Sequence, residues 1–227
     1  MQWDMRQKPE FAICKVTFDA PGEQILLEAD AMVGKDTAVA MKTQVRGGIM
    51  AGLKRKLLSG ESLFQNTFTA SRPGETVWFA PGPDGDMDVH ILDGSHDIML
   101  SNSAFVACAP TVTLDTKFAG VKGFFSGTKL FLIKCSGQGP VWFCGYGAIH
   151  TIDVQPGTSY IVDNNHIVGF TGGLDYNIRK VGGLKSLFLS GEGLVCEFRG
   201  QGRIWIATRS PQGLAAFLAP FRPRKSN

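Results

Sequence analysis

The chain of 227 residues consists largely of short apolar stretches that are separated by turns rich in Gly and Pro, of which it holds 28 and 11. Short stretches with turn signals about every 8 to 12 residues are typical of strands in a β-sandwich or barrel. A helix is expected at 213–219, where Pro220 ends an apolar stretch ahead of a basic tail. We expect its apolar face to dock on the body or on a neighbouring subunit. The pattern therefore predicts an all-β protein with a short C-terminal helix.

One stretch, 52–64, returns twice along the chain, at 120–131 and 183–195. The Ser-Gly steps of the three copies end at Gly60, Gly127 and Gly191, which are 67 and 64 residues apart. A period this steady indicates internal triplication. We interpret the stretch as the place where each β unit begins and packs on the next.

Each copy continues with an apolar pair, a Gly-rich turn and an apolar residue followed by Trp. This order predicts three β-hairpins, which pair 64–70 with 75–80, 129–135 with 140–145, and 193–199 with 203–208. Three of the four tryptophans share the equivalent position, and we expect each to fill a core position in its unit: Trp78, Trp142 and Trp205. A stacking platform for a base or a sugar is the alternative role of this position.

A second element recurs out of phase with the first, at 21–33, 92–105 and 156–168. A turn, a strand, a polar corner and a second short strand fit each copy. The corners carry Asp30, Asn102 and Asn165, residues that tolerate left-handed backbone. Turn chemistry accounts for these residues without a ligand.

Together, the two elements predict three tandem related units, each like a β-sandwich or a double-stranded β-helix, with pseudo-threefold symmetry in one compact body. The units extend over about 10–80, 81–145 and 146–210, with strand exchange between them allowed, and 211–227 forms a C-terminal segment.

Composition and charge favour a globular protein without a nucleic-acid partner. The chain is 44% hydrophobic and 19% charged, and its formal net charge of +3 is too small to favour nucleic acid or an anionic membrane. The five cysteines are spread out without a Cys-x-x-Cys pair, which favours free buried thiols in a reducing cytoplasm. The N-terminus lacks the features of a signal or transit peptide, and no apolar run of about 18 residues predicts a membrane span. We therefore expect a cytoplasmic location.

A phosphate or anion site is the first candidate chemistry. One lysine recurs in all three copies of the repeated stretch, at Lys54, Lys122 and Lys185. These lysines would meet on a pseudo-threefold axis if the axis bound an anion. A P-loop requires Gly-Lys-Ser/Thr between a strand and a helix, and no copy has that order. Solvated lysines beside glycines that allow close backbone approach are the alternative.

A metal site is the second candidate. Asp86, Asp88 and His90 alternate along one predicted strand and could hold a single metal ion through oxygen and nitrogen ligands. A solvated sheet edge is the structural alternative for these residues. No Gly-x-Ser-x-Gly elbow and no Cys beside a His in a helix-start context occurs, so we predict no catalytic residues, no cofactor and no enzymatic activity.

Several motifs resemble a known family. They are Gly-Leu-Lys-x-x-Leu-x-Ser-Gly-Glu, Asn66-Thr67-Phe68, Ala80-Pro81-Gly82, Asp115-Thr116-Lys117-Phe118, Tyr146-Gly147-Ala148-Ile149-His150 and Val181-Gly182-Gly183-Leu184-Lys185. In this order they are similar to the family of altered inheritance of mitochondria protein 24, over about 11–220. The resemblance implies a fold like that of the tryptophan RNA-binding attenuation protein, with three related β units. It implies no catalytic residues, and a fold alone does not imply RNA binding.

The leading functional hypothesis is a non-enzymatic structural or protein-interaction module that self-associates or docks a partner through edge strands and the C-terminal segment. A homo-oligomer or a protein partner is therefore expected. The first alternative is a module that binds a small molecule, an anion or nucleic acid on the pseudo-threefold axis. The second alternative is a metal-dependent enzyme at Asp86, Asp88 and His90.

Overall fold

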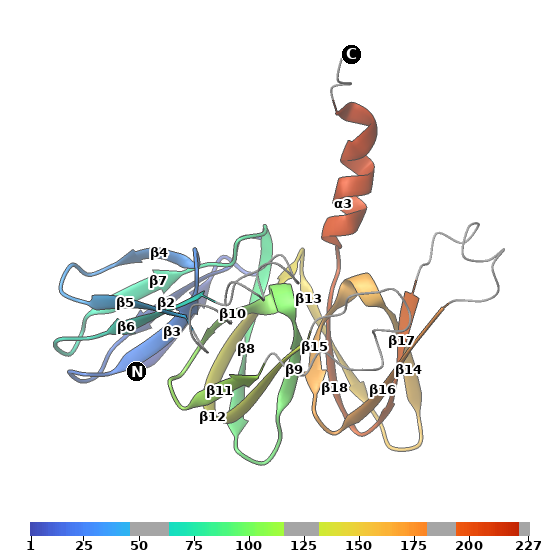
Figure 1. Cartoon of the computed structure of the whole chain (residues 1–227), viewed down its shortest axis with the longest axis horizontal. Coiled ribbons are helices and arrows are strands. Elements are labelled where there is room, and N and C mark those ends of the chain that lie inside the picture. Colours follow the sequence, from blue (N-terminus) through green and yellow to red (C-terminus); the bar gives the residue numbers. More distant parts are fainter. Residues whose placement is uncertain (46–63, 116–131, 181–193, 223–227) are drawn as a thin grey trace.

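The computed structural model describes residues 1–45, 64–115, 132–180 and 194–222, which form three successive groups of β strands in a row (Figure 1). The first group comprises β1 (Gln2–Arg6), β2 (Ile13–Thr17), β3 (Gln24–Glu28), β4 (Met32–Lys35), β5 (Ala40–Val45), β6 (Phe64–Thr69) and β7 (Thr76–Phe79). The second group comprises β8 (Gly85–Asp93), β9 (Ile98–Ser101), η1 (Asn102–Ala104), β10 (Phe105–Cys108), β11 (Val112–Asp115) and β12 (Leu132–Tyr146). The third group comprises β13 (Ile149–Val154), β14 (Ser159–Asp163), η3 (Asn164–His166), β15 (Ile167–Thr171), β16 (Leu174–Lys180), β17 (Leu194–Gly200) and β18 (Gly202–Ala207).

The strands pair by the same scheme in each group. In the first group, β7 lies between β2 and β4, and β6 lies between β3 and β5. In the third group, β18 lies between β13 and β15, and β17 lies between β14 and β16. In the second group, the long strand β12 corresponds to both central strands. Its first half lies between β9 and β11, and its second half lies between β8 and β10. All of these pairings are antiparallel.

The three predicted hairpins are wrong. The strands expected to pair in the first and third hairpins, β6 with β7 and β17 with β18, lie in different layers. Strand β12 runs through the turn of the second expected hairpin as one strand. Glycine explains the difference, because Gly137 and Gly139 have φ values of +112° and +120°. A Cβ at Gly137 would lie 2.4 Å from the carbonyl oxygen of Thr111. These glycines bend the strand across to the second layer instead of reversing it.

Two further antiparallel pairings, which we call the internal joints, link the groups: β10 with β3, and β15 with β9. Within the described residues, the row of groups is open. Strand β4 ends the sheet β1-β2-β7-β4, and β14 ends the sheet β14-β17-β16, at opposite ends of the molecule in Figure 1. The predicted repeat with pseudo-threefold symmetry is not confirmed by this arrangement and stays a prediction.

Three clusters of buried apolar side chains stabilise the three groups. The first contains Val77 and Phe79, the second contains Ile133 and Phe143, and the third is built around Phe198. Along β7, these buried residues alternate with the partly exposed Thr76 and Trp78. One face of each strand thus fills the sandwich core, as expected from the two-residue period of a strand.

The C-terminal helix α3 (Pro211–Leu218) starts two residues earlier than predicted. The Ser210 hydroxyl caps it by accepting a hydrogen bond from the Gly213 amide at 3.1 Å. Pro220 does not end the helical path, because the turn η4 (Ala219–Phe221) includes it. Of the two expected docking sites, the body of the same chain is wrong, since no residue of α3 is buried and the helix stands away from the sheets (Figure 1). Docking on a neighbouring subunit stays a prediction.

Candidate interaction surfaces

The internal joints are short, buried ladders. Ala107 lies opposite Leu27 in the first joint, and Gly169 lies opposite Leu100 in the second. All four residues of β10 and the first four of β15 are buried. Burial of apolar side chains against the neighbouring group therefore holds the row together.

Each joint places a small residue directly after a β-bulge. The bulge in β10 lies between Phe105 and Ala107, and that in β15 lies between Ile167 and Gly169. A Cβ at Gly169 would lie 2.7 Å from Leu100 Cδ2 and 2.7 Å from the Met99 carbonyl oxygen. The neighbouring strand approaches so closely that no larger residue fits without a shift.

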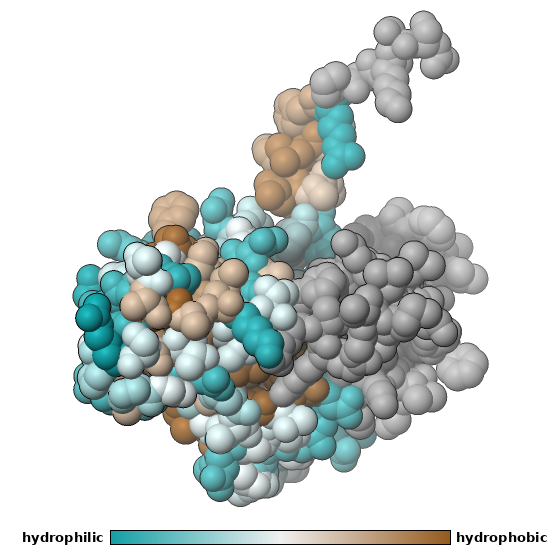
Figure 2. Space-filling view, turned by 60° about the vertical axis from the view of Figure 1, so that its left-hand side comes forward, coloured by the Kyte–Doolittle hydropathy of each residue, from teal (hydrophilic) through white to brown (hydrophobic). Residues whose placement is uncertain are grey.

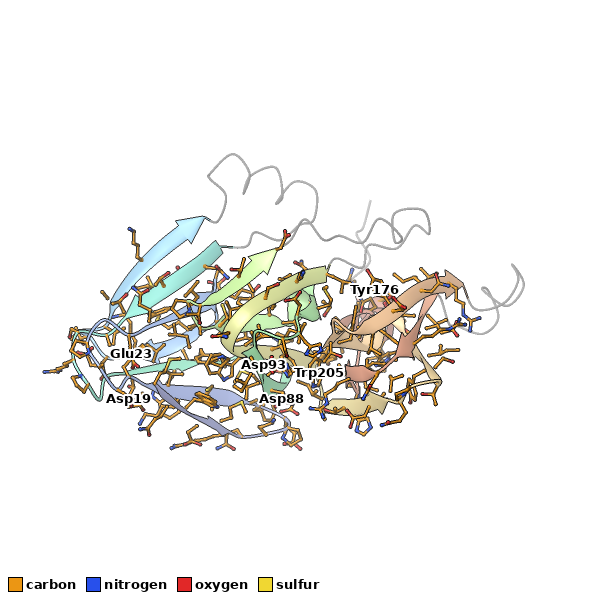
Figure 3. The ribbon with its side chains drawn as sticks, turned by 90° about the horizontal axis from the view of Figure 1, so that it is seen from below. Asp19, Glu23, Asp88, Asp93, Tyr176 and Trp205 are labelled. Carbon is orange, nitrogen blue, oxygen red and sulfur yellow. The ribbon has the colours of Figure 1, made fainter. Side chains whose placement is uncertain are left out.

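The structure corrects the predicted placement of the repeated tryptophans. Trp142 of the second group is fully buried in the cluster of the first group, 5.6 Å from the Phe79 ring centre. Trp205 of the third group is buried in the cluster of the second group, 5.0 Å from the Phe143 ring centre, and Figure 3 shows it beside Asp88 and Asp93 of the second group. Each of these tryptophans therefore fills the core of the preceding group, because it points away from its own sandwich.

Trp78 has no preceding group to enter, and it lies partly exposed on the outer face of β7. The Arg6 guanidinium and the Lys15 ammonium lie over its ring, 5.4 and 5.6 Å from the centre. Cation–π contacts at exposed sites contribute about 0.5–1 kcal/mol, less than the burial of an indole. The three predicted core tryptophans thus occupy two environments, buried and partly exposed.

The strands β4 and β14, which we call the free ends, expose apolar side chains. Val33 is 60% exposed on β4, and Tyr160 and Ile161 are 44% and 48% exposed on β14. Their counterparts in the second group, Val106, Ile98 and Met99, are buried. An unpaired strand edge with apolar side chains is a template for pairing with another chain.

The segment Pro211–Phe221, which we call the C-terminal arm, is a second exposed apolar surface. Figure 2 shows its apolar side chains standing above the body. They are Leu214, Phe217, Leu218 and Phe221. Phe217 and Phe221 lie 5.7 Å apart between ring centres. The arm therefore presents a small aromatic surface that the described body does not cover.

The structure does not bring the three metal candidates together. Asp86 is buried and accepts a hydrogen bond from the Ile149 amide at 3.2 Å. The Lys8 ammonium lies 3.6 Å from a carboxylate oxygen of Asp86 and 3.6 Å from one of Asp88. Within the described residues, no group of three or more His, Cys, Asp or Glu side chains could hold a metal ion. The two carboxylates pair with a lysine instead.

His90, the third metal candidate, packs against Trp205 at 5.3 Å between ring centres. Burial lowers the pKa of its imidazole, which keeps the ring neutral at neutral pH. Beside it lies an open depression of about 380 Å³ that Asp153, Gln201 and Arg203 help to line. Arg203 Nε donates to Asp153 Oδ1 at 3.0 Å, so the positive charge there is already paired.

The five cysteines are free and buried, as predicted. Burial raises the pKa of the Cys14, Cys144 and Cys196 thiols to about 12. Because the thiolate is the nucleophile, these thiols are inert at neutral pH. They contribute packing rather than chemistry.

The lysines proposed for an anion site, Lys54, Lys122 and Lys185, lie outside the described residues, as do most of the three copies of the repeated stretch. Among the residues that are described, no helix has the length and apolar character needed to cross a membrane. Sequence reasoning named edge strands in general but did not single out β4 and β14. A signal for them was the recurrence of 21–33, 92–105 and 156–168, whose copies include all of β14 and its counterpart β9 but only the first residues of β4, β10 and β15.

Comparison with known proteins gives a consistent family assignment. The family model described as "Mitochondrial biogenesis AIM24" matches residues 3–209. A protein of Streptococcus pyogenes serotype M6, described as uncharacterized, is 26% identical over 235 residues, which cover 100% of this chain and 93% of that protein. A crystal structure of a Streptococcus pyogenes protein superposes with a TM-score of 0.79 at 26% identity, and the match covers 97% of this chain and 99% of that one. The fold described above is thus shared with a solved structure over nearly its whole length.

Proposed function

The chain belongs to the AIM24 family, and on this premise we propose that it is a non-enzymatic structural or protein-interaction module that associates with further copies of itself. The observation that carries the proposal is the open row of strand groups. Strands β10 and β15 are buried in the internal joints, whereas β4, in the same place of the pairing scheme, is a free end. Free ends of this kind gain stability when a further sheet covers them.

The chemistry of the described residues also favours a binding role over a catalytic one. The cysteine thiols are buried, His90 packs against an indole ring, and Asp86 is held by a backbone amide and a lysine. A catalytic group needs both access to a substrate and a suitable pKa. The described part of the chain offers apolar edges with better access than any of these groups.

Two further features belong to this proposal. The common pairing scheme supports an origin by triplication, with three β units related by a pseudo-threefold operation. Free thiols persist in a reducing compartment, which supports a cytoplasmic setting.

Native mass spectrometry and sedimentation velocity over a wide range of protein concentration test the proposed function. We expect species at multiples of the chain mass of 24.5 kDa, and their share should grow with concentration. A single species of 24.5 kDa at every concentration would contradict self-association.

A further inference from the structure

We propose that β14 of one copy pairs with β4 of the next in an antiparallel ladder that reproduces the internal joints. In this ladder, Val162 lies opposite Gly34, and Ile161 lies opposite Lys35. The partner is thus a second copy of this chain, bound head to tail. This inference rests on the proposed function, and it adds the surface, the register and the direction of association.

The β4 side of the register follows from the bulges. In both internal joints, the small residue directly after the bulge lies opposite the neighbouring strand, as Ala107 and Gly169 do. Strand β4 has the same bulge between Met32 and Gly34. Gly34 is therefore the counterpart of Ala107 and Gly169. A Cβ added at Gly34 meets no atom within 4 Å, because the neighbour that crowds Gly169 has no equivalent there.

The β14 side of the register follows from the short helical turns that come directly after β9 and β14. The short helical turn η1 begins two residues after Leu100, and η3 begins two residues after Val162. Leu100 is the residue that lies opposite Gly169 in the second internal joint. Val162 is therefore the counterpart of Leu100, and it lies opposite Gly34 when the joint is repeated between copies.

The same arrangement explains Trp78. Trp142 packs against Phe79, the residue after Trp78, and Trp205 packs against Phe143, the residue after Trp142. At each joint, a Trp therefore contacts the residue that follows the equivalent Trp in the preceding group. In the third group that residue is Ile206, which is only partly buried. Across the proposed joint, Trp78 of one copy packs on Ile206 of the other. Its ring then loses its contacts with the Arg6 and Lys15 side chains.

Charge and the exposed side chains favour a second copy as the occupant. Both halves of the joint are present on the one chain, so each copy carries a donor end and an acceptor end. In the proposed register, Lys35 lies diagonal to Asp163, which places opposite charges within reach. A head-to-tail contact of this kind forms a ring if the rotation closes and an open filament if it does not.

The first test uses matched charge variants. Ile161→Lys places a charge in the proposed joint, whereas Ile91→Lys places one at an equally exposed position on β8, since the two isoleucines are 48% and 50% exposed. We expect Ile161→Lys to weaken self-association at least about tenfold in sedimentation velocity, because the new charge would be desolvated in the joint and would lie opposite the like charge of Lys35. Ile91→Lys should associate like the original protein. Equal association of the two variants would overturn the proposed joint.

The second test fixes the register. Protein with Lys35→Cys is mixed with protein with Ile161→Cys under mild oxidation, so that only pairing between copies can join the new thiols. We expect a covalent dimer from this mixture and none when Met41→Cys, at an exposed position of the edge strand β5, replaces Lys35→Cys. The native cysteines are buried and should not contribute.

The outcomes separate the two proposals. A protein that stays monomeric at all concentrations contradicts both the proposed function and the joint. A protein that associates, but forms no disulfide between positions 35 and 161 and tolerates Ile161→Lys, retains the proposed function and loses the joint. Disulfide formation together with weakened association of Ile161→Lys supports both.

Discussion

The internal joints and the free ends place corresponding strands in opposite surroundings. Strand β10 is buried along its whole length, whereas its counterpart β4 has Met32 and Val33 exposed. The same difference separates Trp142 and Trp205, which are buried in a preceding group, from Trp78, which has no such group. A local sequence thus specifies the strand, and the presence of a neighbour decides whether the strand becomes core or surface.

Truncation of the tryptophans should show the largest difference between the two regions. Trp142→Ala leaves a cavity in a closed core, so we expect it to lower the free energy of unfolding by about 3–5 kcal/mol. Trp78→Ala should lower it by about 1 kcal/mol or less in dilute protein, because only exposed cation–π contacts are lost. Urea denaturation below the concentration of association measures both values. Equal losses would mean that Trp78 belongs to the core of the single chain.

Substitution of the joint glycines should give the next largest effect. Gly169→Val forces Cβ against Leu100 and the Met99 carbonyl, so we expect a loss of about 1–3 kcal/mol in the free energy of unfolding. Gly34→Val enters open space and should change that free energy by less than about 0.5 kcal/mol. Self-association should still fall for Gly34→Val, because the side chain would meet the neighbouring copy. Unimpaired association of a folded Gly34→Val protein would argue against the repeated joint.

The turn between β6 and β7 should differ from the glycine turns of the other groups by a smaller, pH-dependent contribution to the free energy of unfolding. The buried Glu75 carboxylate accepts hydrogen bonds from the Ser71 hydroxyl and the Ser71 amide, both at 2.7 Å. The hydroxyl bond, more than any other contact, holds the pKa of Glu75 below its ordinary value. Its stabilisation is therefore complete above the ordinary Glu pKa of about 4.3 and is lost as the pH falls toward the lowered value.

Thermal unfolding of Glu75→Gln across this pH range tests that contribution. The variant should be less stable than the original protein near neutral pH, and the two melting temperatures should converge as the pH falls below about 4. Glu10→Gln, at an exposed turn position, serves as the control and should follow the original protein. A constant gap between Glu75→Gln and the original protein would contradict a lowered pKa.

The C-terminal arm should show the smallest effect on the stability of the single chain. Phe217 is 66% exposed, so Phe217→Ala should change the free energy of unfolding by less than about 0.5 kcal/mol. Phe198→Ala, at a fully buried position of the third core, should cost about 3–5 kcal/mol and serves as the reference. A large loss for Phe217→Ala in dilute protein would mean that the arm docks on the body.

The sequence predicted the parts of the fold that depend on local pattern. Short apolar stretches between glycines indicated β strands, and the Ala-rich segment ahead of Pro220 indicated the helix α3. The hairpins were wrong because a Gly-rich turn between two strands allows either a reversal or a crossing between layers. Contacts such as that of Gly137 with the Thr111 carbonyl oxygen decide between these two paths, and they are long-range.

The candidate surfaces were less accessible to sequence reasoning. Trp78, Trp142 and Trp205 share one sequence context, yet only the arrangement of the groups leaves Trp78 at the surface. The alternation of Asp86, Asp88 and His90 suggested a metal site, but Lys8 lies between the two carboxylates. In each case, the arrangement of segments that are distant in the sequence decides the surroundings of these residues.

Hydrogen–deuterium exchange at low and high protein concentration tests the central claim most directly. If copies join through β4 and β14, the backbone amides of 32–36 and 159–163 become protected as the protein associates, because they enter a new ladder. The edge strands β5, β11 and β16 hold equivalent places in the three groups and, among the described residues, pair with no neighbouring group, so they should exchange equally at both concentrations. Association without added protection in β4 and β14 would contradict the account.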